Sequence, residues 1–156
     1  MLLLTFQIGK ERYAVRATEV IEILPLTTIR SIPQAPAYIA GMLDYRNHIL
    51  PVVDLVQLTQ DKQHNKVLSS RIIVMNYPVD TKNMLIGLIA EKVTDTINVA
   101  EDTLSNSQIK LPNADYLGEV LNESGEFIQL IEIKSILTQD VQDMLFQDEN
   151  PKVNLG

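Results

Sequence analysis

The chain of 156 residues contains no cysteine, no tryptophan and only two histidines. The absence of cysteine excludes disulfide bonds, thiolate zinc sites and cysteine nucleophiles. His48 and His64 alone are too few and too far apart for a zinc or iron site, and no Asp-rich calcium loop is present. We therefore expect no metal and no cofactor, and a cytoplasmic setting fits a chain without cysteine best.

Closely spaced glycines are also absent, since the six glycines are never closer than seven residues apart. The sequence therefore contains neither a P-loop nor a dinucleotide-binding fingerprint. No serine lies in a Gly-x-Ser-x-Gly turn, so an α/β-hydrolase type of triad is not indicated. A pair of carboxylates that meet in space remains the one enzymatic alternative. We expect a binding protein rather than an enzyme.

Long hydrophobic runs and dense basic clusters are absent as well. The longest apolar stretches, such as residues 84–90, are far shorter than the roughly 20 residues of a membrane-spanning helix, so we expect no direct membrane insertion. The net charge of −7 is unevenly divided: residues 1–78 carry 8 basic and 6 acidic side chains (+2), and residues 79–156 carry 5 and 14 (−9). Because the basic residues of the second half are scattered and aromatic residues are few, we expect no nucleic-acid binding.

What the chain does contain is a series of short alternating segments that are typical of β-strands. Residues 4–8 and 13–15 flank a turn and predict a hairpin. The segment 38–55 predicts two strands that meet at a tight turn near Arg46–Asn47, because asparagine tolerates a positive φ. Pro51 has no N–H for a strand ladder, so its strand should lie at an edge or carry a bulge.

The second half of the chain shows the same pattern. Residues 71–75 and 84–90 are almost continuously apolar, as expected of strands buried on both faces. Residues 116–121 and 127–133 flank a turn that contains Gly125, and they predict another hairpin. We therefore predict a mainly β fold with two strand-rich halves.

Helices are predicted at two places. Residues 18–24 have the spacing of a short helix that Pro25 would end. Residues 137–145, behind a cap at Thr138, predict a short amphipathic helix that either covers one end of the fold or docks on a partner, and we favour the first. The polar stretch 57–70 has no sustained period and indicates a surface connection.

Several different motifs occur one after another along the chain. Residues 32–55 read Ile-Pro-x-Ala-Pro-x-Tyr-Ile-x-Gly-x-x-x-x-Arg-x-x-Ile-Leu-Pro-Val-Val-Asp-Leu. This segment closely resembles the signature stretch of the CheW-like domain of bacterial chemosensory systems. Further pieces upstream, such as Val20-x-Glu22-Ile23, and downstream, such as residues 87–93, extend the resemblance to roughly residues 3–145.

The resemblance implies a fold. CheW-like domains consist of two small five-stranded, SH3-like barrels packed together, with short helices. We expect a single CheW-like domain over residues 1–146. Its first barrel should take about residues 1–58 plus parts of the carboxy-terminal segment, and its second about residues 70–133. Residues 147–156 are expected to form a flexible acidic tail.

The resemblance also implies a function. It indicates a non-enzymatic adaptor that couples chemoreceptors to a CheA-type histidine kinase through protein–protein contacts. The expected partners are the regulatory domain of that kinase and the cytoplasmic tip of methyl-accepting chemoreceptors, which would recruit the chain to membrane-associated arrays. Two alternatives stay open: a binding module of a non-flagellar pathway, such as pilus motility or surface sensing, and a variant that sequesters the kinase.

Candidate contact residues follow from the same match. Gly41 and Arg46 occupy the family's G-x-x-x-x-R element, and Glu22 occupies the acid of its V-x-E-I element. Arg46 offers a planar fork of donors for a carboxylate, and Glu22 is one candidate partner. Either this pair only fixes the turn, or Arg46 contacts the kinase or receptor. The other candidates are Asp44, Tyr45 and Asn47 at the turn, and Val20, Ile23, Met42, Leu43 and Val93 for an apolar receptor groove.

The turn departs from the family pattern. The family usually has glycine after the arginine and Asn-Leu before it, whereas this chain has Asn47 and Asp44-Tyr45. Asparagine adopts a positive φ at modest cost, so the departure leaves the fold intact. It changes the charge and shape of the turn surface, which suggests a dedicated partner.

Overall fold

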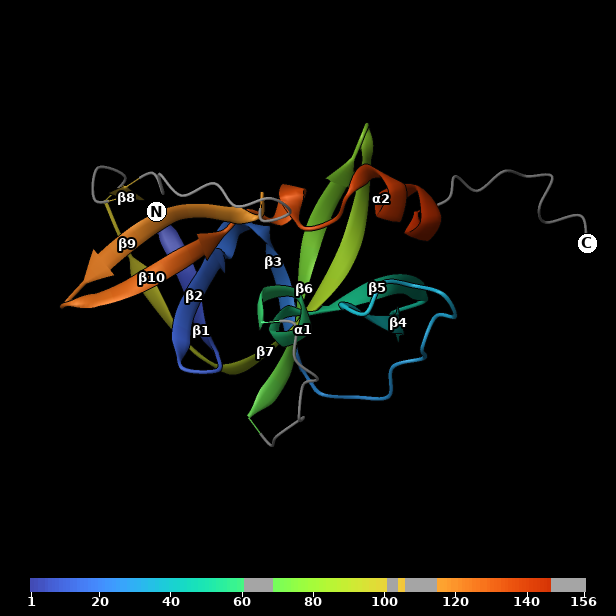
Figure 1. Cartoon of the computed structure of the whole chain (residues 1–156), viewed down its shortest axis with the longest axis horizontal. Coiled ribbons are helices and arrows are strands. Elements are labelled where there is room, and N and C mark those ends of the chain that lie inside the picture. Colours follow the sequence, from blue (N-terminus) through green and yellow to red (C-terminus); the bar gives the residue numbers. More distant parts are fainter. Residues whose placement is uncertain (61–68, 101–103, 106–114, 147–156) are drawn as a thin grey trace, which may run out of the picture.

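The structure is a computed structural model that describes residues 1–60, 69–100, 104–105 and 115–146 (Figure 1). The expected acidic tail at 147–156 lies outside the described residues. The fold is mainly β, as predicted. Its elements are β1 (Leu2–Ile8), β2 (Glu11–Arg16), β3 (Val20–Pro25), β4 (Ile39–Tyr45), β5 (His48–Asp54), α1 (Leu55–Gln60), β6 (Ser70–Val79), β7 (Lys82–Asn98), β8 (Leu104–Ser105), β9 (Leu117–Glu123), β10 (Glu126–Ile131) and α2 (Gln139–Leu145).

The strands form two lobes that share the long strand β7. The central lobe contains β3, β4, β5, β6 and the first part of β7; the terminal lobe contains β1, β2, β8, β9, β10 and the end of β7. Residues 82–91 of β7 pair with β6, and residues 91–98 pair with β1. In Figure 1 the terminal lobe lies on the left and β4 and β5 of the central lobe lie on the right.

This grouping differs from the expected barrels, of which the first took about residues 1–58 plus parts of the carboxy-terminal segment and the second about residues 70–133. β1 and β2 pair with the end of β7 and with β10, whereas β3 pairs with β6. The strand pairs of the described residues also form one sheet of ten strands rather than two closed barrels. In the central lobe, a single bridge between Arg30 and Met42 links the segment after β3 to β4. The local pattern indicates strands but not their partners, because pairing is decided by contacts far apart in the sequence.

Three apolar clusters fill the interior of the part of the chain that the structure describes. The central-lobe cluster comprises Leu43, Tyr45, Leu50, Val52, Ile72, Val74 and Ile89, and the terminal-lobe cluster comprises Leu3, Ala14, Val99, Leu121, Ile128 and Leu130. The larger shared cluster takes side chains from both lobes, among them Phe6, Val15, Val53, Ile73, Met75, Leu88 and Ile131. Alternating side chains of β6 separate two of these, since Ile72 and Val74 face the central-lobe cluster and Ile73 and Met75 face the shared cluster. All four side chains are fully buried. Burial of each contributes about 1.5–3 kcal/mol to the stability of the folded state. The predicted burial on both faces is confirmed for residues 72–75, whereas Arg71 is partly buried.

Residues 20–25 form strand β3 rather than the predicted helix. Val20, Ile21 and Ile23 are β-branched, which favours a strand, and β6 supplies a ladder along β3. Within residues 17–25, helical backbone is confined to a single 3-10 turn at Ala17–Glu19 that precedes β3. The helical spacing of the apolar residues was therefore outweighed by tertiary pairing.

The two short helices both cover the shared cluster. α2 begins at the predicted cap, where the Thr138 hydroxyl accepts a hydrogen bond from the Val141 N–H at 3.3 Å. Val141 packs into the shared cluster, and Phe146 just beyond the helix stacks on Tyr77 with 5.6 Å between ring centres. α1 begins at Leu55, before the segment 57–70 predicted as a surface connection, and runs into it to Gln60. At its start the Asp54 carboxylate accepts a hydrogen bond from the Val56 N–H at 3.0 Å.

Candidate partner-binding site

β4 and β5 are joined by the two-residue turn Arg46–Asn47. Both residues have positive φ, 48° for Arg46 and 66° for Asn47, which is the geometry of a tight hairpin turn. Tyr45 and His48 pair on either side of it. The predicted turn is confirmed, and the hairpin carries Arg46 at its tip.

The side chains of Glu22, Tyr45 and Arg46 meet at this turn, and we call these three residues the turn cluster. Nη2 of Arg46 donates a hydrogen bond to Oε1 of Glu22 at 2.7 Å. The Tyr45 hydroxyl donates to the same oxygen at 2.7 Å. The Arg46 guanidinium carbon lies 5.2 Å from the centre of the Tyr45 ring, within the range of a cation–π contact. The Glu22–Arg46 pair considered from the sequence is therefore formed.

The turn cluster holds the guanidinium in place without covering it. The Arg46 side chain is 72% exposed, against 34% for Glu22. Among the described residues, Glu22 is the ion-pair partner of Arg46. The hydrogen bond to Glu22, with a contribution from burial, raises the pKa of the Tyr45 hydroxyl, so Tyr45 stays protonated and remains a donor at neutral pH. Because exposed ion pairs add only about 0–1 kcal/mol to stability, the arrangement does more to orient Arg46 than to stabilise the fold.

Gly41 has a different place, at the other end of β4. Its φ is 150°, and a Cβ there would lie 2.0 Å from the carbonyl oxygen of Arg30. That carbonyl accepts from the Met42 N–H at 2.7 Å, and the Arg30 N–H donates to the Met42 carbonyl at 3.0 Å. Gly41 thus permits the close backbone approach that links the segment after β3 to β4.

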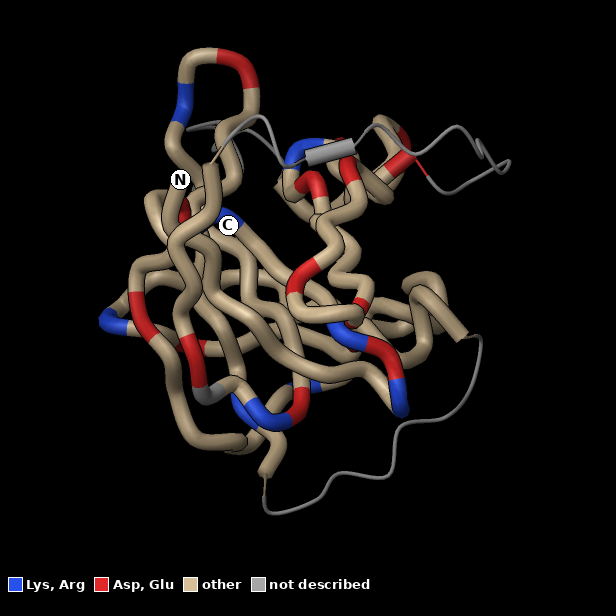
Figure 2. The backbone as a smooth tube through the Cα atoms, turned by 90° about the vertical axis from the view of Figure 1, so that its left-hand side faces the viewer, with Lys and Arg blue, Asp and Glu red and all other residues tan. Residues whose placement is uncertain are grey.

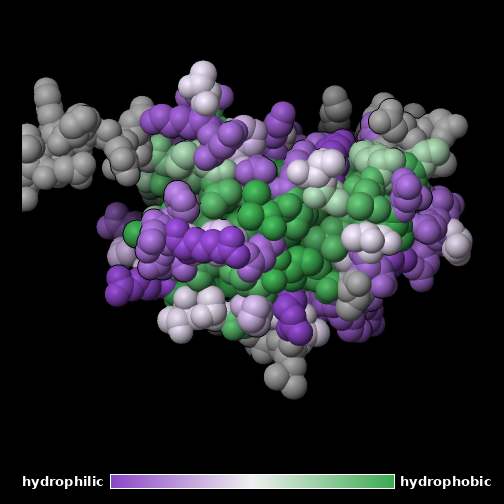
Figure 3. Space-filling model, turned by 180° about the vertical axis from the view of Figure 1, so that it is seen from behind, coloured by the Kyte–Doolittle hydropathy of each residue, from purple (hydrophilic) through white to green (hydrophobic). Residues whose placement is uncertain are grey.

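Three of the candidate groove residues lie along the margin of the shared cluster. Val20 and Val93 are partly buried and pack against it. Ile23 is 41% exposed and is paired with Ile73 of that cluster, so it lies on the same face of the sheet. We call Val20, Ile23 and Val93 the groove margin. Seen from behind, the molecule has a broad hydrophobic area across its middle (Figure 3).

Met42 and Leu43 do not join this set. Leu43 is 5% exposed and pairs with Leu50 inside the central lobe, so its side chain is not accessible to a partner. Met42 is partly buried and, because side chains alternate along a strand, faces the opposite side of β4. The assignment of Leu43 to a surface groove is corrected by this register.

Other exposed apolar side chains escaped the sequence reasoning. Ile49 on β5 is 69% exposed, Phe127 on β10 is 68% exposed and Ile21 on β3 is 45% exposed. Ile49 and Phe127 each precede a buried residue, Leu50 and Ile128, so their side chains lie on the other face of the strand. The helix interpretation of residues 18–24 hid Ile21.

Neither a metal cluster nor a membrane-spanning helix is found within the described ranges. No three His, Cys, Asp or Glu side chains there are grouped as metal ligands. No helix of this part of the chain is both long and apolar enough to cross a membrane. Figure 2 shows one side of the molecule, on which Lys and Arg positions lie beside Asp and Glu positions rather than in one patch.

Comparison with known proteins decides the family. Residues 2–141 match the model of the CheW-like domain. The chain belongs to the CheW-like domain family. The match spans nearly all of the chain, so the resemblance seen in the signature segment is confirmed.

Relatives of this CheW-like chain carry chemotaxis names. The chemotaxis protein CheW of Treponema pallidum is 25% identical over 138 residues, which are 87% of this chain and 81% of the relative. The chemotaxis protein CheW of Rhizobium meliloti is 26% identical over 149 residues, 90% of each chain. The crystal structure of the scaffolding protein TtCheW from Thermoanaerobacter tengcongensis matches with a TM-score of 0.77 at 21% identity, and covers 90% of this chain and 89% of that one. This structural likeness confirms the fold, and the CheW family is one of chemotaxis scaffold proteins.

Proposed function

We propose that this CheW-like chain is a non-enzymatic adaptor that couples methyl-accepting chemoreceptors to a CheA-type histidine kinase in a bacterial chemosensory array. The observation that carries the proposal is the turn cluster, in which Glu22 and Tyr45 orient an arginine that is 72% exposed. Family membership supports the scaffold class. A single CheW-like domain over residues 1–146 would perform this role from the cytoplasm.

The turn cluster is our candidate for the contact with the regulatory domain of the kinase. Arg46 has donors left over from its single bond to Glu22, and a guanidinium holds a carboxylate through strong charge-assisted hydrogen bonds. A side chain already ordered by Glu22 and Tyr45 loses less conformational entropy when a partner binds. The flanking side chains of Asp44 and Asn47 are exposed and would contribute to the choice of kinase.

The groove margin is our candidate for the contact with the receptor tip. Val20 and Val93 pack against the shared cluster, and Ile23 lies on the same face of the sheet as that cluster. Accessible apolar side chains of this kind suit contact with the hydrophobic face of a helix. An adaptor must engage both partners at once, and we assign the two contacts to different residues.

Size-exclusion chromatography with the kinase regulatory region tests the kinase contact. We expect wild-type protein to co-elute, Arg46→Glu to lose co-elution, and the circular dichroism spectrum to stay unchanged. Lys10→Glu is the matched control, because it reverses an exposed cation at a turn of the other lobe and should co-elute normally. Retention of the complex by Arg46→Glu would contradict the assigned contact.

Two alternatives are separated by further assays. Addition of a receptor-tip fragment should give a ternary complex if the chain is an adaptor, whereas a kinase-sequestering variant would compete with the receptor. The replacement of the family's usual turn residues by Asp44, Tyr45 and Asn47 favours a dedicated kinase, as in a pathway for pilus motility or surface sensing. Pull-down against every kinase paralogue of the source cell should then recover one, and equal binding to all would contradict this.

A further inference from the structure

His48 is the first residue of β5 and lies beside the turn cluster. It pairs directly with Tyr45 of β4, and the side chains of directly opposite residues lie on the same face of a strand pair, within contact of each other. The next side chains of this face on β5, Leu50 and Val52, are buried in the central-lobe cluster, to which Tyr45 also belongs. His48 itself is exposed. Its imidazole therefore lies at the solvent-exposed end of this cluster, next to the ring whose hydroxyl donates to Glu22.

The groups around His48 come from its own hairpin and from two neighbouring strands. The hairpin and β3 supply the turn cluster, in which Glu22 and Arg46 carry opposite charges. On the other side of β5, β7 contributes the uncharged side chain of Leu85 to the same cluster. Asp44 is exposed, and alternation along β4 directs its side chain to the opposite face of the hairpin. The turn cluster together with His48 is therefore neutral while the imidazole is neutral, and it carries one net positive charge once the imidazole is protonated.

Histidine is the side chain whose charge ordinarily changes between about pH 5 and 8. We propose that His48 makes the kinase contact depend on pH, so that association strengthens as the pH falls and the imidazole gains a proton. The inference rests on the proposed function, because it assumes that the turn cluster meets the kinase.

The partner surface that fits this device is acidic. A kinase carboxylate that accepts from Arg46 would lie beside a second positive charge when His48 is protonated. Carboxylates ordinarily lose their proton near pH 4, so the partner would keep its negative charge over the whole range in which histidine changes its own. The attraction therefore grows as the pH falls, and complementary charge of this kind raises both the rate and the selectivity of association.

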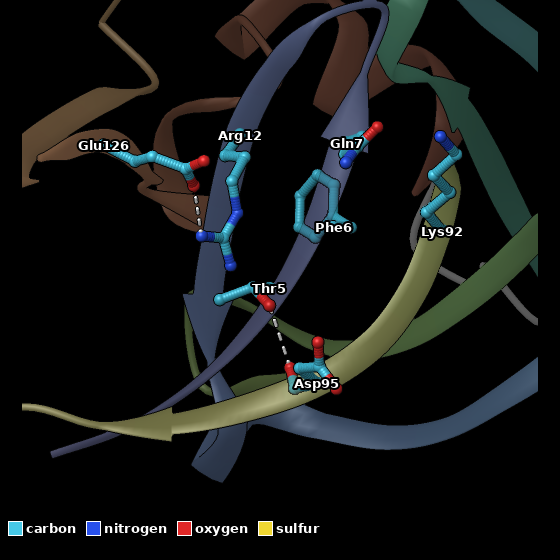
Figure 4. Close-up of a pocket in the computed structure, with 7 residues that line it drawn as sticks. All are labelled: Thr5, Phe6, Gln7, Arg12, Lys92, Asp95 and Glu126. Atoms are coloured by element: carbon cyan, nitrogen blue, oxygen red, sulfur yellow. Dashed lines mark hydrogen bonds and ion pairs between the residues drawn. The ribbon is translucent and has the colours of Figure 1, made fainter. Parts of the chain in front are cut away.

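The terminal lobe offers a matched position for a control. Nη1 of Arg12 donates to Oε2 of Glu126 at 2.8 Å, and Gln7 of β1 pairs directly with Arg12 (Figure 4). Gln7 thus lies beside an arginine–glutamate pair of the other lobe, as His48 lies beside the turn cluster. A histidine at position 7 would bring the same change of charge to a similar setting away from the proposed contact.

Isothermal titration calorimetry of the full chain with the regulatory region of the CheA-type kinase tests the inference. Wild type and His48→Gln are compared from about pH 5.5 to about pH 8, so that ionisation of the kinase itself cancels in the ratio of their affinities. We expect this ratio to rise about threefold to tenfold in favour of the wild type as the pH falls. The gain should shrink at about 0.5 M salt, because salt screens exposed charges.

Three further variants locate the effect. His64→Gln removes the other histidine of the chain and should keep the wild-type response to pH. His48→Gln combined with Gln7→His keeps two histidines and should behave as His48→Gln does. Arg46→Glu should lose association at every pH. Proton NMR of the imidazole resonances, assigned with the two single histidine variants, should place the titration of His48 in the same pH range as the gain in affinity.

The outcomes separate this inference from the proposed function. If His48→Gln keeps the full response to pH, or the histidine moved to position 7 restores it, the inference is overturned while the loss of association by Arg46→Glu leaves the kinase contact in place. A gain in affinity outside the pH range of the His48 titration overturns it as well. If Arg46→Glu associates as the wild type does, or the wild type associates at no pH, the proposed contact fails and this inference fails with it.

Discussion

The Arg16–Glu132 pair of the terminal lobe and the Arg46–Glu22 pair of the central lobe have opposite surroundings. In the terminal lobe, Arg16 donates to both oxygens of Glu132, at 2.7 and 3.0 Å, and only 29% of its side chain is exposed. In the central lobe, Arg46 makes one bond to Glu22 and is 72% exposed. Arg16 is committed to the fold, whereas Arg46 is available to a partner. The geometry of a pair, rather than its residue types, separates a structural role from a binding role.

The glycines of the two lobes show a parallel difference. A Cβ on Gly41 would lie 2.0 Å from the backbone oxygen of Arg30, which cannot move without breaking the Arg30–Met42 bridge. A Cβ on Gly118 would lie 2.9 Å from the side chain of Glu132, which can rotate. The central lobe therefore depends on one backbone approach that the terminal lobe does not need.

The largest expected effect comes from alanine at these glycines. Gly41→Ala should lower the free energy of unfolding by about 3 kcal/mol or more, because a backbone clash and a positive φ act together. Gly118→Ala should lower it by about 1 kcal/mol, through strain on Glu132. Urea titration followed by circular dichroism measures both. Equal losses would remove the distinction between the lobes.

The ion pairs can be compared with the same substitution. Arg16→Gln should lower the free energy of unfolding by about 1 kcal/mol, since it removes two charge-assisted bonds of a partly exposed pair. Arg46→Gln should lower it by about 0.5 kcal/mol or less and should weaken association with the kinase instead. Urea titration and a binding isotherm are needed for each variant. A larger stability loss for Arg46→Gln would reverse the assignment of roles.

Tyr45→Phe tests whether the Tyr45 hydroxyl helps to orient Arg46 in the turn cluster. The substitution keeps the ring beneath the guanidinium and removes the hydroxyl that donates to Glu22. We expect a small loss of stability, with a several-fold lower kinase affinity as Arg46 becomes less ordered. A double-mutant cycle with Glu22→Gln should show coupling between the two positions. Additive effects would mean that Tyr45 and Glu22 act separately.

The smallest expected effect at neutral pH is that of tyrosine ionisation on the stability of the fold. All five have pKa values raised from the ordinary 10.0, chiefly by burial in four of them and by the hydrogen bond to Glu22 in Tyr45. A raised pKa means that the folded state binds the proton more tightly, so this stabilisation is complete below pH 10 and is lost as the pH rises beyond it. Urea titrations at increasing pH should show falling stability above about pH 10, and a flat profile there would contradict the shifts.

Much of the fold is predictable from local patterns. The apolar runs 71–75 and 84–90, the turn Arg46–Asn47 and the helix behind Thr138 follow from alternation, turn preference and capping, which act over a few residues. Strand β3 does not, because its apolar residues have helical spacing and the ladder with β6 that makes it a strand is a long-range contact. The grouping into lobes also depends on long-range pairing, since β1 meets the end of β7 about 90 residues later in the chain.

The candidate site is predictable only in part. The family resemblance brought Glu22 and Arg46 together as a possible pair, and the structure forms it. It also grouped Leu43 with surface residues, because the resemblance carries no register and a shift of one position moves a side chain to the other face.

The continuity of β7 has a consequence for how the molecule unfolds. One unbroken strand supplies backbone partners to β6 in one lobe and to β1 in the other, and the shared cluster takes side chains from both. Unfolding of either lobe would remove backbone hydrogen-bond partners and apolar contacts from the other lobe. The protein should therefore denature in one cooperative transition, with amides on the two lobes exchanging at a common slowest rate.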